Sequence, residues 1–295
     1  MILAISLALL AGMMWSVGNV IDKTVVSKYV KKPLEIMPLI GIIIFVSGFL
    51  VTLFNRNILD SIVVLRLGGL GFGIYISFVF FYFALKHEEV SRVIPFLGLA
   101  PAIMVIMEWL FFGTRLIVLQ YWGIVSVVIG AIFLTWRKSG QRVHPKGIIF
   151  ALFSTLFWSS SFVFITRTYN QYGFWKPWGW TWLFLGIFCL LTYFFVRSSL
   201  LDSLRKSGYK LLLAAMAGET IHTIADALIF YAGSLWVASL TSAVASDQYI
   251  LIFLFSLLVT WKKPQWFKEK ITPKIIVQKS ISILLIIAGI FLISV

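Results

Sequence analysis

Long apolar runs separated by short polar connections cover almost the whole chain. Each run approaches the roughly 20 mostly apolar residues that a helix needs to cross the hydrocarbon layer of a bilayer. The connections are too short to hold a soluble domain. We therefore predict an all-α integral membrane protein. Its ten transmembrane helices are expected at residues 2–21, 36–54, 67–85, 93–112, 116–136, 147–165, 178–196, 211–232, 237–260 and 275–294.

The composition supports this class: 60% of the residues are hydrophobic, 17% are aromatic and only 12% are charged. The net charge of +14 does not indicate a nucleic-acid partner. The Lys and Arg residues are spread over the connections, where they meet lipid headgroups and water. Cys189, the only cysteine, lies within the seventh predicted span, so no disulfide is expected. The first residues lack the charged region of a signal peptide, and we interpret them as the first helix.

The two halves of the chain resemble one another. Trp15 near the end of the first apolar run has a counterpart in Trp158, 143 residues later. Gly130-Ala131-Ile132-Phe133-Leu134 corresponds in the same way to Gly289-Ile290-Phe291-Leu292-Ile293. Five helices per repeat would invert the second copy, an arrangement typical of alternating-access transporters with a site near the membrane midplane. The alternative is chance similarity between apolar helices.

Three motifs resemble a known family when they are taken in order. They are the spacing from Trp15 to Lys23, the run Tyr82-Phe83-Ala84-Leu85-Lys86 followed by Pro101, and the segment from Gln120 to Gly130. Together they resemble the EamA-type, ten-helix branch of the drug/metabolite transporter (DMT) superfamily. The resemblance implies two EamA-like five-helix units at 2–136 and 147–294, joined by a basic loop at 137–146.

The chain departs from that family pattern in two places. Gly113-Thr114-Arg115 stands where the family usually has a Gly-Glu-Arg-like turn. In the second copy Tyr249 stands where the first has the proline, and the last connection, which contains Lys262, Lys263 and Pro264, is longer. These departures weaken the transfer of a substrate from any particular relative, and they hardly affect the fold.

Three ionisable residues gather within the eighth predicted span. Glu219, His222 and Asp226 are three and seven positions apart, so they share one helical face. The matching positions of the third span hold only Gly71, Ile74 and Phe78, so packing alone does not require the acids. An acid at a helix centre costs about 2.5–3.5 kcal/mol on insertion scales and needs a partner or a wet cavity.

We interpret this stripe as a substrate-binding or proton-coupling site, because acids in a poorly solvated cavity and a histidine can exchange protons near neutral pH. Asp247 and Gln248 of the ninth span extend the polar patch. The alternative for all five is a set of hydrogen bonds that only lock helices together. No second histidine or cysteine lies nearby in the sequence, so we expect no metal site. For Glu108, near the end of its span, the structural interpretation is preferred.

The end of the first span holds a second polar group. Asn19 and Lys23 are possible cavity residues, although an ordinary interfacial ion pair of Asp22 with Lys23 is the preferred interpretation. Aromatic faces favour organic and cationic ligands, which makes several rings potential cavity walls. They are Trp15, Trp158, Tyr75, Tyr82 and Tyr231. Trp175, Trp178, Trp180 and Trp182 are expected instead to form an interfacial aromatic belt.

We predict a secondary transporter in the cell membrane, which moves small organic metabolites or drug-like molecules by alternating access. No nucleotide-binding loop is seen, so the energy would come from a gradient, from coupled protons or from exchange. No cofactor, enzymatic activity or nucleic-acid partner is expected, and membrane lipids surround the protein. The alternatives are an intramembrane enzyme that uses Glu219, His222 and Asp226, and a non-transporting receptor or assembly subunit.

The distribution of basic residues predicts the orientation. When Lys279 is counted with the last connection, the odd-numbered connections carry 20 of the 25 Lys and Arg residues. Short loops rich in Lys and Arg stay in the cytoplasm. We therefore expect these connections inside and both termini outside, although relatives of this type generally have both termini inside.

A cysteine at Ser139, in a chain whose Cys189 is replaced, tests this orientation. The central loop should resist a membrane-impermeant thiol reagent in intact cells and react after the cells are opened. Rapid labelling in intact cells would establish the opposite orientation.

Overall fold

The computed structural model describes residues 1–55, 59–88, 93, 96–135, 144–252, 254 and 273–294. In these residues it contains eleven α-helices and one 3-10 helix, with no strand. The helices are α1 (Ile2–Lys28), η1 (Pro33–Glu35), α2 (Ile36–Phe54), α3 (Ser61–His87), α5 (Ala100–Phe112), α6 (Val118–Thr135), α7 (Pro145–Tyr172), α8 (Trp175–Leu191), α9 (Tyr193–Ser207), α10 (Tyr209–Leu235), α11 (Ala238–Val244) and α13 (Pro273–Ser294). The all-α membrane class is confirmed.

Six helices in the described part of the chain are long and apolar enough to cross a membrane: α1, α2 with η1, α3, α7, α10 and α13. The helices α5 and α6 are apolar but shorter. Most long helices extend beyond the predicted spans, because hydropathy marks only the lipid-facing length while the backbone hydrogen bonds continue. The count of ten stays a prediction, since the fourth and ninth spans run partly through residues outside the described ranges.

The seventh predicted span, 178–196, is wrong at its end. The helix α8 stops at Leu191, and α9 leaves it at an angle of 65°. The hydroxyl of Thr192 donates to the Phe188 carbonyl over 3.1 Å, a back-bond of the kind that often bends helices. Residues 193–196 therefore belong to α9, which carries Arg197, Asp202, Arg205 and Lys206.

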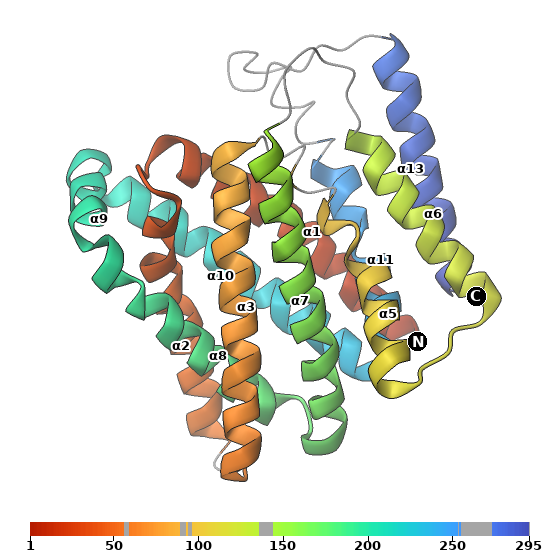
Figure 1. Cartoon of the computed structure of the whole chain (residues 1–295), viewed down its shortest axis with the longest axis horizontal. Helices are drawn as coiled ribbons and strands as arrows, with labels where there is room; N and C mark the ends of the chain where they lie inside the picture. Colours follow the sequence, from red (N-terminus) through yellow and green to blue (C-terminus); the bar gives the residue numbers. More distant parts are fainter. Residues whose placement is uncertain are drawn as a thin grey trace.

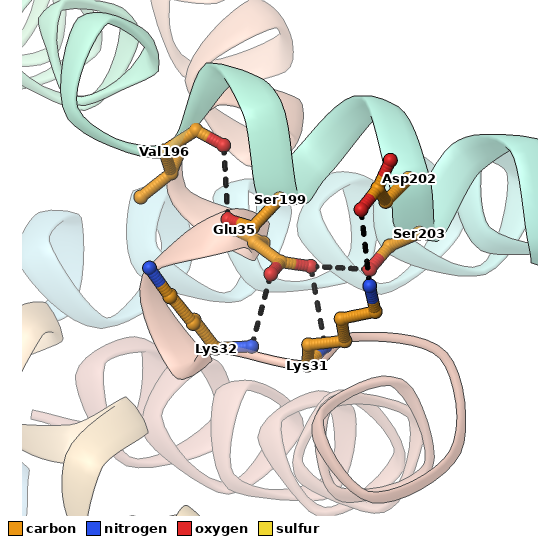
Figure 2. Close-up of polar contacts among 7 residues, drawn as sticks. All are labelled: Lys31, Lys32, Glu35, Val196, Ser199, Asp202 and Ser203. Carbon is orange, nitrogen blue, oxygen red and sulfur yellow. Dashed lines mark hydrogen bonds and ion pairs between the residues drawn. The ribbon is translucent and has the colours of Figure 1, made fainter.

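A buried carboxylate holds α9 to the connection between α1 and α2 (Figure 2). Glu35 accepts hydrogen bonds from the backbone N–H groups of Lys31 and Lys32 at 3.2 and 3.0 Å, and from the Ser203 hydroxyl at 2.6 Å. The Lys31 ammonium lies 3.1 Å from an Asp202 carboxylate oxygen. The first and seventh connections therefore lie on the same side of the bundle.

The major helix contacts join the part of the chain before residue 136 to the part after residue 143. The helix α1 packs along α10, α3 along α7, α2 along α8 and α6 along α13, while α5 contacts α11. Figure 1 shows α6 and α13 side by side at one edge of the molecule and α9 at the opposite edge. The two halves are therefore interleaved rather than set apart as two bodies.

Glycines bring the backbones of α2 and α8 close together. A Cβ on Gly48 would lie 2.3 Å from the backbone nitrogen of Leu183, and one on Gly186 would lie 2.5 Å from that of Phe45. The contacts are reciprocal: Gly48 and Gly186 are 138 positions apart, as are Phe45 and Leu183. Backbones this close gain dispersion contacts along their length, which is a main source of helix association in lipid.

The pair of α6 and α13 shows the same reciprocity. A Cβ on Gly130 would lie 2.9 Å from the Ser282 carbonyl, and one on Gly289 would lie 2.6 Å from the Gly123 carbonyl. Both steps along the chain, from Gly130 to Gly289 and from Gly123 to Ser282, are 159 positions. We call the two glycine-packed contacts, α2 with α8 and α6 with α13, the glycine seams.

Replacing Gly48 by Ala tests the first seam. The new methyl group would force the α2 and α8 backbones apart, and overpacking of this kind typically costs about 1–3 kcal/mol. We expect a lower melting temperature of the purified protein. Gly69→Ala is the matched control, because a Cβ there meets nothing within 4 Å. Equal stability of the two variants would contradict the close packing of α2 on α8.

Candidate functional site

The helices α1, α3, α7 and α10 surround a cavity whose empty space measures about 770 Å³, including the space at its opening. Eight of the twelve residues predicted for the site line it. They are Glu219, His222, Asp226, Gln248, Trp15, Asn19, Tyr82 and Trp158.

The stripe on α10 faces this cavity along one side. Glu219 and Asp226 are 2% and 3% exposed, so both carboxyl groups are removed from bulk solvent. Glu219 accepts a hydrogen bond from the Thr223 hydroxyl at 3.1 Å, and Asp226 accepts one from the Trp15 indole N–H at 2.9 Å. The shared helical face expected from the sequence thus brings the three residues to one chamber.

Asp22 of α1 is the central polar residue that the sequence interpretation missed as a cavity residue. One of its carboxylate oxygens lies 3.3 Å from His222 Nε2 and accepts a hydrogen bond from the Tyr82 hydroxyl at 3.2 Å. This contact joins α1, α3 and α10 around the cavity. A helical spacing from Trp15 and Asn19 to Asp22 was the available signal, since these positions share one face of α1.

Lys23 points elsewhere, and its ammonium donates to the carbonyls of Leu85 and Glu88 at 2.8 and 2.9 Å. These carbonyls lie at the carboxyl end of α3, where a cation also interacts favourably with the helix dipole. The expected interfacial pair of Asp22 with Lys23 is therefore wrong for Asp22, which contacts His222 and Tyr82. Lys23 is absent from the cavity wall that the structure describes.

Asp247 and Gln248 directly follow a break in the ninth span, and their side chains lie in different places. The helix α11 ends at Val244, a turn covers Ala245 and Ser246, and helix resumes at Asp247. Gln248 lines the cavity and accepts a hydrogen bond from the Asn19 amide at 3.3 Å.

Asp247 packs against α1 at Gly12, where an added Cβ would come within 1.8 Å of its carboxylate. Neither of its carboxylate oxygens accepts a hydrogen bond of normal geometry from a described residue, although the Gln248 backbone N–H lies nearby. Asp247 therefore stands beside the chamber and outside its described wall.

Two predicted aromatic residues lie outside the described wall. The Tyr75 hydroxyl is 3.0 Å from that of Thr192, at the bend between α8 and α9. Tyr231 is 38% exposed and contacts Phe174. The expected aromatic belt is also wrong in part, because Trp178 and Trp182 are buried and stack on one another with ring centroids 4.7 Å apart.

Further lining residues come from positions that the sequence interpretation did not select. Phe78 and Phe81 of α3 and Ser154 and Thr155 of α7 complete the wall, together with Ser77, Leu97, Ala100, Ser242 and Tyr249. On α7, Ser154 and Thr155 precede Trp158 by about one turn, so helical spacing from a selected residue was again the available signal.

Glu108 is buried and has a structural role. Its carboxylate accepts hydrogen bonds from the backbone N–H groups of Ala238 and Ser239 at 3.0 and 3.4 Å, and from the Ser239 hydroxyl. These groups form the start of α11, where backbone donors lack partners within the helix. Glu108 of α5 therefore caps α11 from another helix instead of reaching an interface.

The chain is similar to known proteins in sequence and in fold. Residues 2–136 match the model of the EamA-like transporter family. Among 29 chains of solved structures that match, one titled "Crystal structure of protein" superposes with a TM-score of 0.67 at 17% identity, over 98% of this chain and 95% of its own. At this identity the likeness shows the fold alone. No curated protein matches the chain.

Replacing Glu108 by Ala tests the capping role. Two backbone N–H groups would lose their acceptor in a buried place, which costs about 1–3 kcal/mol each. We expect the melting temperature to fall by several degrees. Ser239→Ala should lower it less, because both backbone bonds remain. A stable Glu108→Ala protein that has lost only ligand binding would argue against the structural role.

Proposed function

We propose that this chain is a multi-pass membrane transporter of the drug/metabolite type, which moves small organic molecules through the cavity by alternating access. The match of residues 2–136 to the EamA-like transporter family supports the transporter class. The energy would come from an ion or proton gradient or from exchange. The observation that carries this proposal is the chamber itself. Four helices bring the acids Asp22, Glu219 and Asp226, the base His222 and several aromatic rings around one space.

The reciprocal contacts support two inverted repeats at 2–136 and 147–294, joined by the loop 137–146. In both glycine seams, exchanging each residue for its counterpart in the other half reproduces the same contact. The helix pairs follow the same rule. In the two repeats α1 corresponds to α7 and α3 corresponds to α10, so the contact of α1 with α10 has its counterpart in the contact of α7 with α3. A two-fold relation between the halves accounts for both patterns.

Broken helices at the chamber add to this support. One turn, at Gly98 and Leu99, precedes α5, and another, at Ala245 and Ser246, follows α11. Ala100 and Gln248, which are 148 positions apart, line the cavity next to these turns. Discontinuous helices in transporters typically lie at the substrate and ion sites.

The proposed orientation keeps the odd-numbered connections in the cytoplasm. The contacts of Lys31 with Asp202 and of the Glu88 carboxylate with the His144 backbone N–H join the first connection to the seventh and the third to the fifth. Within each of these two pairs the connections lie on the same side of the bundle, which is consistent with the distribution of basic residues.

Asp226→Asn tests the functional role of the stripe. The amide keeps the size of the side chain and an acceptor for the Trp15 N–H, so the protein should fold. We expect transport in proteoliposomes to fall by at least roughly tenfold and to lose its pH dependence, because proton exchange needs a titrating group. The solute would be chosen by a thermal-shift screen of metabolites on the wild-type protein.

Asp202→Asn is the matched control, since this carboxylate lies outside the cavity in contact with Lys31. It should transport at the wild-type rate. A well-folded Asp226→Asn protein with wild-type transport and an unchanged pH profile would contradict the functional role of Asp226 and leave it a structural one.

A further inference from the structure

The described wall of the cavity carries more acidic than basic groups. Asp22, Glu219 and Asp226 line it together with a single base, His222, and none of its described lining residues is Lys or Arg. His222 lies 3.3 Å from Asp22 and shares the wall with Glu219 and Asp226, which accept hydrogen bonds from the neutral donors Thr223 and Trp15, so one base faces three acids. Burial makes acids that outnumber the cationic groups around them costly, so a ligand with a positive charge would be stabilised here.

Aromatic rings form the other part of the wall. Trp15 meets Trp158 edge to face with centroids 5.9 Å apart, and Phe78 stacks on Trp158 at 6.4 Å. Each ring belongs to a different helix, namely α1, α7 and α3. The faces of such rings attract cations, most strongly in tryptophan and in sites shielded from water.

One hydrogen bond joins the acidic and the aromatic parts. The Trp15 indole donates to Asp226 at 2.9 Å, so the ring edge is fixed beside the carboxylate. Donation to a carboxylate also draws electron density into the indole, which strengthens the attraction of its face for a cation. A cation on the Trp15 face would lie close to Asp226 as well.

We infer that the chamber takes organic cations, in which an ammonium group meets Asp226 beside Trp15 and an apolar or aromatic body lies among Trp15, Phe78 and Trp158, while Glu219 adds to the negative charge of the wall. The inference rests on the proposed function in that it names the substrate class of the same site. An anionic ligand would meet the acids without a free cation on the described wall. A zwitterion would need a partner for its carboxylate.

A series of indoles with one ring system and different charges tests the inference. Binding of tryptamine, 3-ethylindole, indole-3-propionate and tryptophan to the purified full chain is measured at pH 7 by titration calorimetry. We expect tryptamine to bind at least roughly tenfold more tightly than the neutral and the anionic compound, since charge-assisted contacts are the strong ones. Equal binding of 3-ethylindole, or tighter binding of indole-3-propionate or tryptophan, would overturn it.

Binding measurements on variants test which residues bind the ammonium group and the ring of tryptamine. Asp226→Asn should weaken tryptamine roughly tenfold or more and leave 3-ethylindole unchanged, whereas Asp202→Asn should change neither. Trp158→Leu should weaken both compounds, because the neutral one also contacts the ring. Unchanged tryptamine binding in a folded Asp226→Asn protein contradicts the assignment, and if that variant does not fold, the ligand series on the wild-type protein decides.

The proteoliposome assay separates this inference from the proposed function. Transport of neutral or anionic solutes without tryptamine binding would keep the transporter and exclude the cationic class. Tryptamine binding without transport of any solute, tryptamine included, would keep the site and exclude the transport mechanism.

Discussion

A carboxylate inside a bundle of apolar helices is stable only where side chains or backbone N–H groups solvate it. Lipid tails are as apolar as leucine side chains, so the hydrophobic effect does not favour one helix–helix contact over another. The buried acids add contacts between particular helices here. Glu108 joins α5 to α11, Asp22 joins α1 to α3 and α10, and Asp226 joins α10 to α1. The hydrogen bonds and close contacts that stabilise these carboxylates thus also join the helices around the cavity.

The helical class follows from the sequence because a backbone in lipid must satisfy its own hydrogen bonds, and long apolar runs permit only helices. The bend at Thr192 was not predictable from hydropathy, since residues on both sides of it are apolar. The break after α11 was equally hidden, because Ala245 and Ser246 carry no proline or glycine signal. At Thr192 the bend accompanies a hydrogen bond from the side-chain hydroxyl to the Phe188 carbonyl, which hydropathy does not reveal.

The stripe on α10 was predictable because three ionisable residues share one helical face and have few alternatives in lipid. Asp22 was assigned to its sequence neighbour Lys23, but its partner His222 lies 200 positions away and no local pattern indicates such a contact. Lys23 has backbone carbonyls as its partners, which a sequence does not display. The tryptophans divide in a similar way, since both a buried core and a membrane interface favour them; only packing decides that Trp182 is enclosed.

The glycine seams have a mechanical consequence. Each seam joins a helix of the first half to one of the second, and its backbones are too close to slide or part without losing contacts along their whole length. We therefore expect the pairs drawn from both halves to move as blocks, rather than one half to rock against the other as a unit. The contacts across the chamber are of another kind, because they include single hydrogen bonds such as Asn19 to Gln248, which can be exchanged one at a time if each freed group finds a new partner. In the proposed alternating access, the cavity would open by exchange of these polar contacts, while the seams hold their helix pairs together and the lining helices turn against them.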